Sequence, residues 1–430
     1  MRLISPTRTV ALAGAAAALV LVTLPRLGAT AGEQADDALM QRAAGIMSRA
    51  PLIDGHNDLP WEMRVRVAYD TTRLDIRQSQ PGLETDIPRL RAGHVGGQFW
   101  SVYVPASMAG QTAVVATLEQ IAFVHEMARR YPDTFEIAST AADVERIFKA
   151  GRIASMMGVE GGHSIDSSLA TLRMLYELGA RYMTLTHNSN TPWADAANDK
   201  PEHDGLSGFG ETVVHEMNWL GMLVDISHVS PRAMARTLDV SEAPVMFSHS
   251  SARAICDVPR NVPDEILARL PKNGGVVMVN FYNGFVPPDC AARNRAAEEM
   301  AAKFRLEFPG DPKAAQAAIS RWEEAHPPTS TLAQVADHID YIKKLAGIDH
   351  IGIGSDFDGI DGLAPTGLED VSKYPALVVE LLKRGYSDAD VEKIIGGNIL
   401  RALKTAEQVA ARLQKQRGPS TETLKPLAGQ

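Results

Sequence analysis

The sequence has little of what marks a nucleic-acid-binding or a disulfide-rich protein. Its basic residues form no cluster with interleaved aromatic residues, and the formal net charge of the 430 residues is −9. Because nucleic acids are recognised through basic patches, no nucleic-acid partner is expected. The only two cysteines, Cys256 and Cys290, are too few for a disulfide framework. No internal repeat is present, so one domain is the simplest expectation.

The first thirty residues differ in kind from the rest. Arg2 and Arg8 precede an apolar, alanine-rich run over residues 10–25, which is followed by Ala29-Thr30-Ala31. This pattern predicts a signal peptide over residues 1–31, cleaved after Ala31. The alternative is an uncleaved anchoring helix, but the run is shorter than the roughly 20 residues of a membrane span. We therefore expect an exported protein, periplasmic or secreted.

Two further signals for membrane attachment are missing. No cysteine lies at the cleavage site for lipid modification, and residues 421–430 are polar rather than apolar. We expect no stable membrane anchor after cleavage. In an oxidising compartment Cys256 and Cys290 can form one bridge, whereas two buried thiols are the alternative. Export favours the bridge.

The chain from residue 50 to 356 alternates between short apolar runs and amphipathic helical stretches. Near-continuous apolar runs are typical of strands that are buried on both faces. Eight such runs occur, at residues 51–54, 97–104, 153–159, 181–186, 222–227, 244–248, 275–280 and 350–354. This alternation predicts a closed (β/α)8 barrel, with a doubly wound α/β sheet as the alternative.

Helical patterns occupy most of the remaining chain. They cover residues 112–130, 208–220, 331–346, 374–384 and 388–413, and residues 291–326 read as a helical insertion. We expect a single catalytic domain over residues 32–416. Residues 417–430 are expected to be a flexible tail.

Several apolar runs end in side chains that bind divalent metals. These side chains are His56 and Asp58, Glu160, His187, His228, His249 and Asp356. His56 and Asp58 are two residues apart on an extended segment, so both can point the same way. In a (β/α)8 barrel the carboxyl ends of all strands share one face, where catalysis takes place. The barrel prediction therefore gathers all seven side chains into one pocket.

The ligand set indicates a pair of metal ions. Five ligands drawn from these seven side chains, three imidazoles and two carboxylates, are more than one catalytic zinc with an open position uses. Glu160 is the candidate to bridge two ions, because no lysine that could be carbamylated lies between Lys149 and Lys200. Nitrogen and oxygen ligands without thiolate suit Zn²⁺, with Mn²⁺ or Co²⁺ as substitutes.

Five segments of the sequence closely resemble the membrane dipeptidase (renal dipeptidase) family, peptidase family M19. They read IDGHNDLPW, TLTHNSNTPWAD, ISHVS, HSSARAICDVPRNVPD and GSDFDG, and the similarity extends from about residue 50 to 405. The resemblance implies a bacterial exported member with a metal-dependent hydrolase (amidohydrolase-like) barrel. It also implies zinc-dependent hydrolysis of dipeptides, including those with a C-terminal D-residue, by a hydroxide bridging two metal ions.

The resemblance also implies roles for individual residues. His56 and Asp58 would bind one zinc ion and His228 and His249 the other, with Glu160 shared and catalytic. His187 matches the histidine that stabilises the oxyanion. Arg260 matches the arginine that holds the substrate's carboxylate, and Asp356 matches the aspartate that binds its amino group and transfers protons.

The sequence departs from the animal members of the family at several points. One animal disulfide is missing, because Ser189 stands where its cysteine would be, whereas Cys256 and Cys290 match a second pair. Animal members form dimers, so the resemblance suggests a homodimer. The insertion at 291–326 matches nothing in the animal proteins.

Two other functions remain open from the sequence. One is hydrolysis of a different amide or lactam, and the other is a catalytically silent binder of metal or peptide. Acid–base residues such as Glu160, His187 and Asp356 argue against a silent binder. Trp61, Tyr282 and Asn283 are weaker candidates for the pocket lining, and Asp358 for support of its loop.

Overall fold

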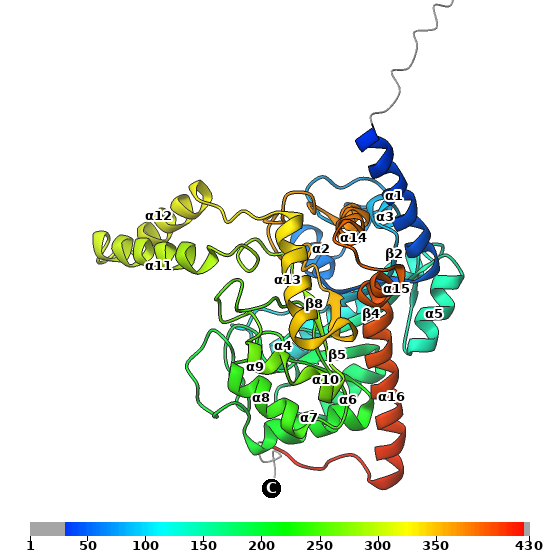
Figure 1. Ribbon diagram of the computed structural model, residues 1–430. Helices are drawn as coiled ribbons and strands as arrows, with labels where there is room; N and C mark the ends of the chain where they lie inside the picture. The colour runs from blue at the N-terminus through cyan, green and yellow to red at the C-terminus, as the bar shows by residue number, and fades with distance from the viewer. Residues whose placement is uncertain (1–30, 425–430) are drawn as a thin grey trace, which may run out of the picture.

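Eight parallel strands close into a barrel in the computed structural model, which describes residues 31–424 (Figure 1). The barrel strands are β1 (Leu52–Asn57), β2 (Val95–Ser101), β4 (Ile153–Val159), β5 (Ala180–Thr184), β6 (Leu223–Asp225), β7 (Val245–Phe247), β8 (Val276–Val279) and β9 (Ile351–Ile353). The ring closes where β1 pairs with β9 and β2 pairs with β4. The (β/α)8 prediction is confirmed, and the doubly wound alternative is wrong because the sheet has no open edge between these strands.

The eight barrel strands correspond one to one to the eight apolar runs of the sequence. Every residue of these strands is buried. Burial on both faces explains why each run is nearly continuous in its hydrophobicity rather than alternating. A further short strand, β3 (Phe135–Ile137), pairs with the start of β4 and was not predicted.

Helices surround the barrel and connect its strands. Those up to β7 are α1 (Ala31–Arg49), α2 (Leu59–Val67), α3 (Ile87–Ala92), α4 (Gln111–Arg130), α5 (Ala141–Lys149), α6 (Leu169–Glu177), α7 (Gly208–Leu220) and α8 (Pro231–Val240). Those after β7 are α9 (Asp264–Leu267), α10 (Leu270–Asn273), α11 (Cys290–Glu307), α12 (Pro312–Ala325), α13 (Leu332–Ala346), α14 (Tyr374–Lys383), α15 (Asp388–Glu392) and α16 (Asn398–Gln416). Of the expected signal peptide, residues 1–31, only Ala31 belongs to the described residues.

Local sequence signals set where several helices begin. Thr331 caps α13 in a capping box with Gln334, and Ser387 does the same for α15 with Asp390. The single helix expected over residues 388–413 is divided by a π turn at Lys393–Gly397. That turn brings Gly396 against β1, where a Cβ atom would lie 2.1 Å from the Pro51 carbonyl oxygen. Only glycine permits this close approach.

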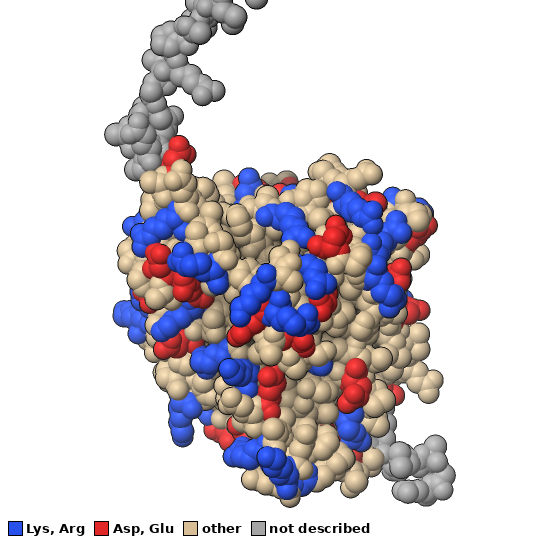
Figure 2. Space-filling view, turned by 90° about the vertical axis from the view of Figure 1, so that its right-hand side faces the viewer, with Lys and Arg blue, Asp and Glu red and all other residues tan. Residues whose placement is uncertain are grey.

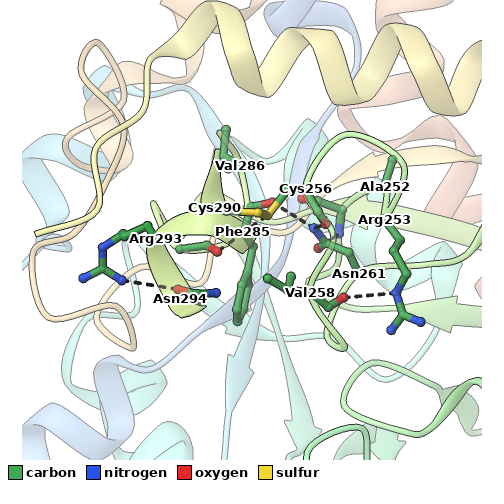
Figure 3. Close-up of a disulfide and its surroundings, with 12 residues drawn as sticks. Ala252, Arg253, Cys256, Val258, Asn261, Phe285, Val286, Cys290, Arg293 and Asn294 are labelled. Carbon is green, nitrogen blue, oxygen red and sulfur yellow. Dashed lines mark hydrogen bonds between the residues drawn. A yellow bond between two sulfur atoms is a disulfide. The ribbon is translucent and has the colours of Figure 1, made fainter. Parts of the chain in front are cut away.

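The predicted helical insertion is confirmed as a hairpin of α11 and α12 that projects away from the barrel (Figure 1). A disulfide between Cys256 and Cys290 joins the first residue of α11 to the loop after β7 (Figure 3). The Arg293 guanidinium closes the base of the hairpin by donating to the His326 carbonyl oxygen at 3.0 Å. The bridge favoured by the sequence is therefore present.

Residues 417–424, which were expected to be flexible, contact α6 and α7. The indole Nε1 of Trp219 donates to the Arg417 carbonyl oxygen at 3.0 Å, and the Ser420 amide donates to Glu216 at 2.9 Å. On the face shown in Figure 2, basic and acidic side chains are interspersed rather than gathered by sign. Within residues 31–424, no helix has the length and hydrophobicity needed to span a membrane.

Candidate active site

All seven predicted side chains lie together at the carboxyl ends of the barrel strands. His56 belongs to β1, Asp58 follows it, and Glu160 comes directly after β4. His187, His228, His249 and Asp356 lie just beyond β5, β6, β7 and β9. Six of the seven are buried, and the Asp356 side chain is 15% exposed. The topology therefore brings residues separated by 300 positions to one rim, as the barrel prediction required.

Glu160 lies at the centre of the cluster, and its two carboxylate oxygens face different partners. Oε1 lies 3.1 Å from His228 Nε2 and 3.5 Å from His249 Nε2. Oε2 lies 3.3 Å from His56 Nε2 and accepts a hydrogen bond from the Ser101 hydroxyl at 3.2 Å. One carboxylate is thus shared between two sets of imidazoles.

The donor atoms meet the requirements of a metal centre. Glu160 belongs to two compact groups of donor atoms, one with His56 and Asp58 and the other with His228 and His249. Asp356 forms a third group with His56 and His249. His56 Nε2 and Asp58 Oδ1 are buried without a hydrogen-bond partner, as expected for atoms that coordinate a cation. The nitrogen and oxygen donors, with no thiolate, fit a divalent transition metal.

Neighbouring side chains fix the orientation of two of the imidazoles. Tyr182 Oη lies 2.7 Å from His56 Nδ1, and Ser248 Oγ lies 2.8 Å from His249 Nδ1. Ser248 Oγ also donates to the buried Asp225 carboxylate at 2.6 Å. Because the Ser248 hydroxyl donates its proton to Asp225, it accepts from His249 Nδ1, and His249 Nε2 presents a lone pair to the cluster. The Tyr182 contact fixes the position of the His56 ring.

Burial and local charge tune the imidazoles for metal binding. Burial, reinforced by the Arg260 guanidinium, lowers the pKa values of His228 and His249 well below the usual range. Burial alone would raise the pKa of Glu160, but His56 and His228 hold it well below its ordinary value. His228 and His249 are therefore neutral imidazoles beside an ionised carboxylate, the protonation states that metal ligands need. Burial would also lower the pKa of His56, but Tyr182, Glu160 and Asp58 raise it well above its usual range.

His187 and Arg260 lie beside the cluster. His187 Nε2 is 3.8 Å from Glu160 Oε1, and burial lowers the pKa of His187. Arg260 is buried, with Nη2 donating to the His249 carbonyl oxygen at 3.4 Å and Nη1 buried without a partner. Burial lowers the pKa of Arg260 to about 10, so the guanidinium stays charged at neutral pH. The Cζ atom of Arg260 lies over the Phe285 ring, 5.4 Å from the ring centroid.

Asp356 occupies the opposite side of His56 from Tyr182. Its Oδ1 is 4.0 Å from His56 Nε2, and its Oδ2 accepts from the Asn280 amide at 2.9 Å. Burial, together with the charges of Asp58 and Glu160, raises the pKa of Asp356 to about 7. A carboxyl group with this pKa can take up and release a proton at neutral pH.

A cavity of about 490 Å³ opens onto the cluster. Its lining includes every predicted residue except the fully buried His56, and Trp61 and Tyr282 as well. Asn283, the other weak candidate, is instead buried against Ser330 and Ala364. Asp358 supports its loop, as expected, by accepting from the Glu84 amide at 2.7 Å, and it also reaches the cavity.

Sequence reasoning missed the residues that orient the ligands. Tyr182, Asp225 and Ser248 lie inside or beside apolar runs, where the sequence pattern predicts core residues and gives no sign of a functional side chain. A weak signal exists for Asp225 and Ser248, because each is a polar residue in an apolar run, within three residues of a predicted ligand. Tyr182 carries no such signal.

The barrel and the buried donor cluster define a class, the metal-dependent hydrolases with a (β/α)8 fold. More narrowly, the chain belongs to the membrane dipeptidase family (peptidase family M19), whose model matches residues 40–417. The family resemblance noted from five sequence segments is thus confirmed. The protein is a metal-dependent enzyme that hydrolyses the peptide bond of dipeptides.

Individual relatives agree with this assignment. An uncharacterized dipeptidase of Schizosaccharomyces pombe is 43% identical over 383 residues, which cover 86% of this chain and 84% of the relative. Among solved structures, the probable dipeptidase PvdM of Pseudomonas aeruginosa has a TM-score of 0.77 at 27% identity and covers 87% of this chain and 100% of its own.

A metallopeptidase from Rhodobacter sphaeroides shares the fold, with a TM-score of 0.69 at 24% identity over 83% of this chain and 99% of its own. That structure is bound to a phosphinate mimic of the dipeptide L-Ala-D-Ala.

Proposed function

We propose that this dipeptidase binds two zinc ions and hydrolyses dipeptides, including those with a D-residue at the C-terminal position. The observation that carries the proposal is the position of Glu160. One of its oxygens faces His228 and His249, and the other faces His56, which lies 3.3 Å from Asp58. A shared carboxylate between two ligand groups is what a binuclear hydrolase requires.

The ligands divide into two sets around that carboxylate. His56 and Asp58 would hold one ion, and His228 and His249 would hold the other. Imidazole and carboxylate donors without thiolate favour Zn²⁺. When bound, the ions lower the pKa of water and so supply hydroxide at neutral pH for attack on the peptide carbonyl.

His187 would stabilise the charge that develops on the carbonyl oxygen. Burial lowers its pKa, so at neutral pH the imidazole is neutral and has one N–H to donate to that oxygen. Such a donor, held on a largely buried side chain, stabilises an oxyanion more than the neutral carbonyl. Tyr103 contacts the His187 ring edge-on at 4.9 Å and limits its rotation.

Arg260 and Asp356 would bind the two ends of the substrate. The unpartnered Nη1 of Arg260 is available to a carboxylate, and a planar guanidinium suits a two-pronged bond to it. Asp356 would bind the free amino group. Because the pKa of Asp356 is about 7, its Oδ1 would also carry a proton and transfer it to the leaving amine. Recognition of both ends in a cavity of about 490 Å³ restricts substrates to two residues.

Tolerance of a C-terminal D-residue is supported by the Rhodobacter sphaeroides relative, whose bound ligand mimics L-Ala-D-Ala. In this chain, the carboxylate would be held by Arg260 whichever way the neighbouring side chain points. The configuration at that carbon therefore matters less than the distance between carboxylate and scissile bond.

Metal analysis and kinetics together test the proposal. The purified protein should contain about two zinc ions per chain, and removing them with a chelator should abolish hydrolysis of L-Ala-L-Ala and L-Ala-D-Ala. One ion per chain in fully active protein would contradict the binuclear site. Failure to cleave any dipeptide when loaded with zinc would contradict the activity.

The role of Arg260 has its own test, which uses a substrate without a carboxylate. The wild type should cleave Ala-Ala with a kcat/KM about 100-fold above that of the dipeptide amide, as a buried charge-assisted bond predicts. In Arg260→Gln this ratio should fall close to one. A ratio that stays high in the variant would show that another group binds the carboxylate.

We also propose that residues 1–31 direct export and are removed, leaving a mature domain over residues 32–416. The Cys256–Cys290 disulfide supports an oxidising compartment. Sequencing of the mature protein from its natural host should begin at Gly32. Recovery of the intact N-terminus in a membrane fraction would favour the uncleaved anchor instead.

A further inference from the structure

A second cavity adjoins the active-site cavity and is strongly acidic. It measures about 440 Å³ and shares Glu62, Asp358 and Asp361 with the active-site cavity. Its charged lining consists of the carboxylates Glu62, Glu84, Asp358, Asp361, Glu369 and Asp370 and the guanidinium groups Arg66 and Arg89. Acidic groups therefore outnumber basic groups at this end of the active site. Burial, together with the charge of Asp358, raises the pKa of Glu84 to about 8, and burial raises that of Asp358 to about 7, so a cation beside them would favour their ionised forms.

Both arginines of this cavity already have acidic partners. Arg66 pairs with Glu62, and Arg89 pairs with Asp86 at 2.8 Å and Asp370 at 3.4 Å. Among residues 31–424, by contrast, no lysine or arginine forms an ion pair with Glu84, Asp358 or Asp361. These three carboxylates are left to interact with whatever enters the cavity.

Glu84 and Asp358 are held together at the wall of the cavity. The Glu84 amide donates to Asp358 Oδ1 at 2.7 Å, and the Asp358 amide donates to Glu84 Oε2 at 2.5 Å. Glu84 is only 8% exposed, and its other oxygen, Oε1, is buried without a hydrogen-bond partner. Asp358 Oδ2 also has no partner in good hydrogen-bond geometry, although the Thr85 hydroxyl interacts with Asp358 and the Gly362 amide with Glu84. Ionised oxygens in this position are costly unless a ligand supplies well-aligned donors.

The loop after β9 connects this cavity to the amino-group site. Asp356, Asp358 and Asp361 all lie on it with φ values of 68°, 63° and 51°. Left-handed backbone is uncommon for residues other than glycine and is concentrated at functional sites. The loop therefore carries one carboxylate for the reacting end of the substrate and two for the space beside it.

We propose that the acidic cavity is a subsite for a cationic side chain, arginine or lysine, on the N-terminal residue of the dipeptide. The inference rests on the proposed function, in which Asp356 holds the amino group. The side chain of that residue would leave the carbon next to the amino group, and the adjoining cavity, which shares Asp358 and Asp361 with the active-site cavity, would be open to it. A guanidinium has N–H groups that could donate hydrogen bonds to Glu84 Oε1 and Asp358 Oδ2.

Arg-Ala and citrulline-Ala make a matched pair for the test, because citrulline replaces the guanidinium by a neutral urea of nearly equal shape. We expect the wild type to cleave Arg-Ala with a kcat/KM about tenfold above that of citrulline-Ala, the gain from one partly desolvated ion pair. The ratio should fall as salt is added, because Asp361 is exposed.

Two variants locate the preference. Glu84→Gln keeps the shape of the buried side chain, and Asp361→Asn removes an exposed charge that does not support the fold. Each variant should lower the ratio of kcat/KM for Arg-Ala to kcat/KM for citrulline-Ala several-fold. Glu324→Gln, which removes an exposed carboxylate from α12, is the control and should keep the ratio.

The outcomes separate the subsite from the activity itself. Equal cleavage of Arg-Ala and citrulline-Ala by the wild type would refute the subsite and leave the dipeptidase proposal intact. Failure to cleave Arg-Ala, citrulline-Ala and Ala-Ala alike would refute the proposed function. A ratio unchanged in both Glu84→Gln and Asp361→Asn would also refute the subsite, because the discrimination would then arise elsewhere.

Discussion

Removing the Ser248 hydroxyl should weaken metal binding without removing a ligand. Ser248 Oγ accepts from His249 Nδ1 at 2.8 Å and donates to Asp225 Oδ2 at 2.6 Å, and all three residues are fully buried or nearly so. In Ser248→Ala, His249 loses the group that fixes its protonated nitrogen. A buried N–H donor is left unpaired, which costs about 1–3 kcal/mol.

That cost converts to a tenfold to hundredfold weaker affinity at the ion bound by His249, as expected for the outer partner of a metal-binding histidine. Asp225 itself should stay in place. It retains hydrogen bonds from the Thr184 hydroxyl and the backbone amides of residues 227 and 248. The damage should therefore remain local to His249.

Competition with a chelator of known affinity measures the effect directly. The unfolding temperature gives a second reading, because a bound ion stabilises the folded chain by RT ln(1 + [metal]/Kd). At a metal concentration well above Kd, a tenfold loss of affinity should remove about 1.4 kcal/mol of metal-dependent stabilisation. The metal-free variant should melt close to the metal-free wild type.

Ser250→Ala is the matched control, because its hydroxyl is buried two residues away and bonds to Ser227 rather than to His249. Metal affinity should be close to that of the wild type in this variant. Unchanged metal affinity in Ser248→Ala, or an equal loss in Ser250→Ala, would refute the argument that the Asp225–Ser248 contact orients the imidazole.

Three other changes test separate features of the fold. Tyr182→Phe removes the hydroxyl 2.7 Å from His56 Nδ1 and should lower metal affinity about tenfold, measured by the same competition. Asp54→Asn disturbs a buried carboxylate that accepts from Ser355 and Tyr374, and should reduce the urea-derived unfolding free energy by about 2–4 kcal/mol. Burial lowers the pKa of His338 to about 4 in the folded chain, against about 6.5 in the unfolded chain. The neutral imidazole therefore contributes its full stabilisation above pH 6.5, and this contribution to the free energy of unfolding is lost as the pH falls toward 4. Between pH 7 and pH 5 the wild type should therefore lose about 2 kcal/mol more than His338→Asn, and equal losses would refute this assignment.

The sequence was sufficient to predict the barrel because its strands are buried on both faces. Each barrel strand appears as an apolar run, and the predicted metal ligands lie at the same end of those runs. His56, Glu160 and His249 could therefore be assigned to one pocket before any distance was known. The three-residue strand β3 escaped prediction because Phe135–Ile137 is too short and too mixed to form such a run.

Other features depend on contacts that no local pattern encodes. The contact of Tyr182 with His56 joins residues 126 positions apart, and burial makes Tyr182 look like core. The pairing of Glu84 with Asp358 spans 274 positions and consists of backbone amides that bond to carboxylates. The π turn at Lys393–Gly397 depends on the close approach of Gly396 to β1, which is a property of the assembled barrel.

The meeting of β1 with β9 also has a consequence for how the enzyme matures. The pair joins Asp54 to Ile353, so the first and last strands of the ring are about 300 residues apart. Pairing over such long separations is slow, because the entropy of a large loop is lost before many contacts form. The ring closes only with β9, so the donor cluster around Glu160 cannot form until nearly the whole chain is available to fold. We therefore expect metal binding to be a late event in maturation, and chains truncated before β9 to be inactive toward peptides.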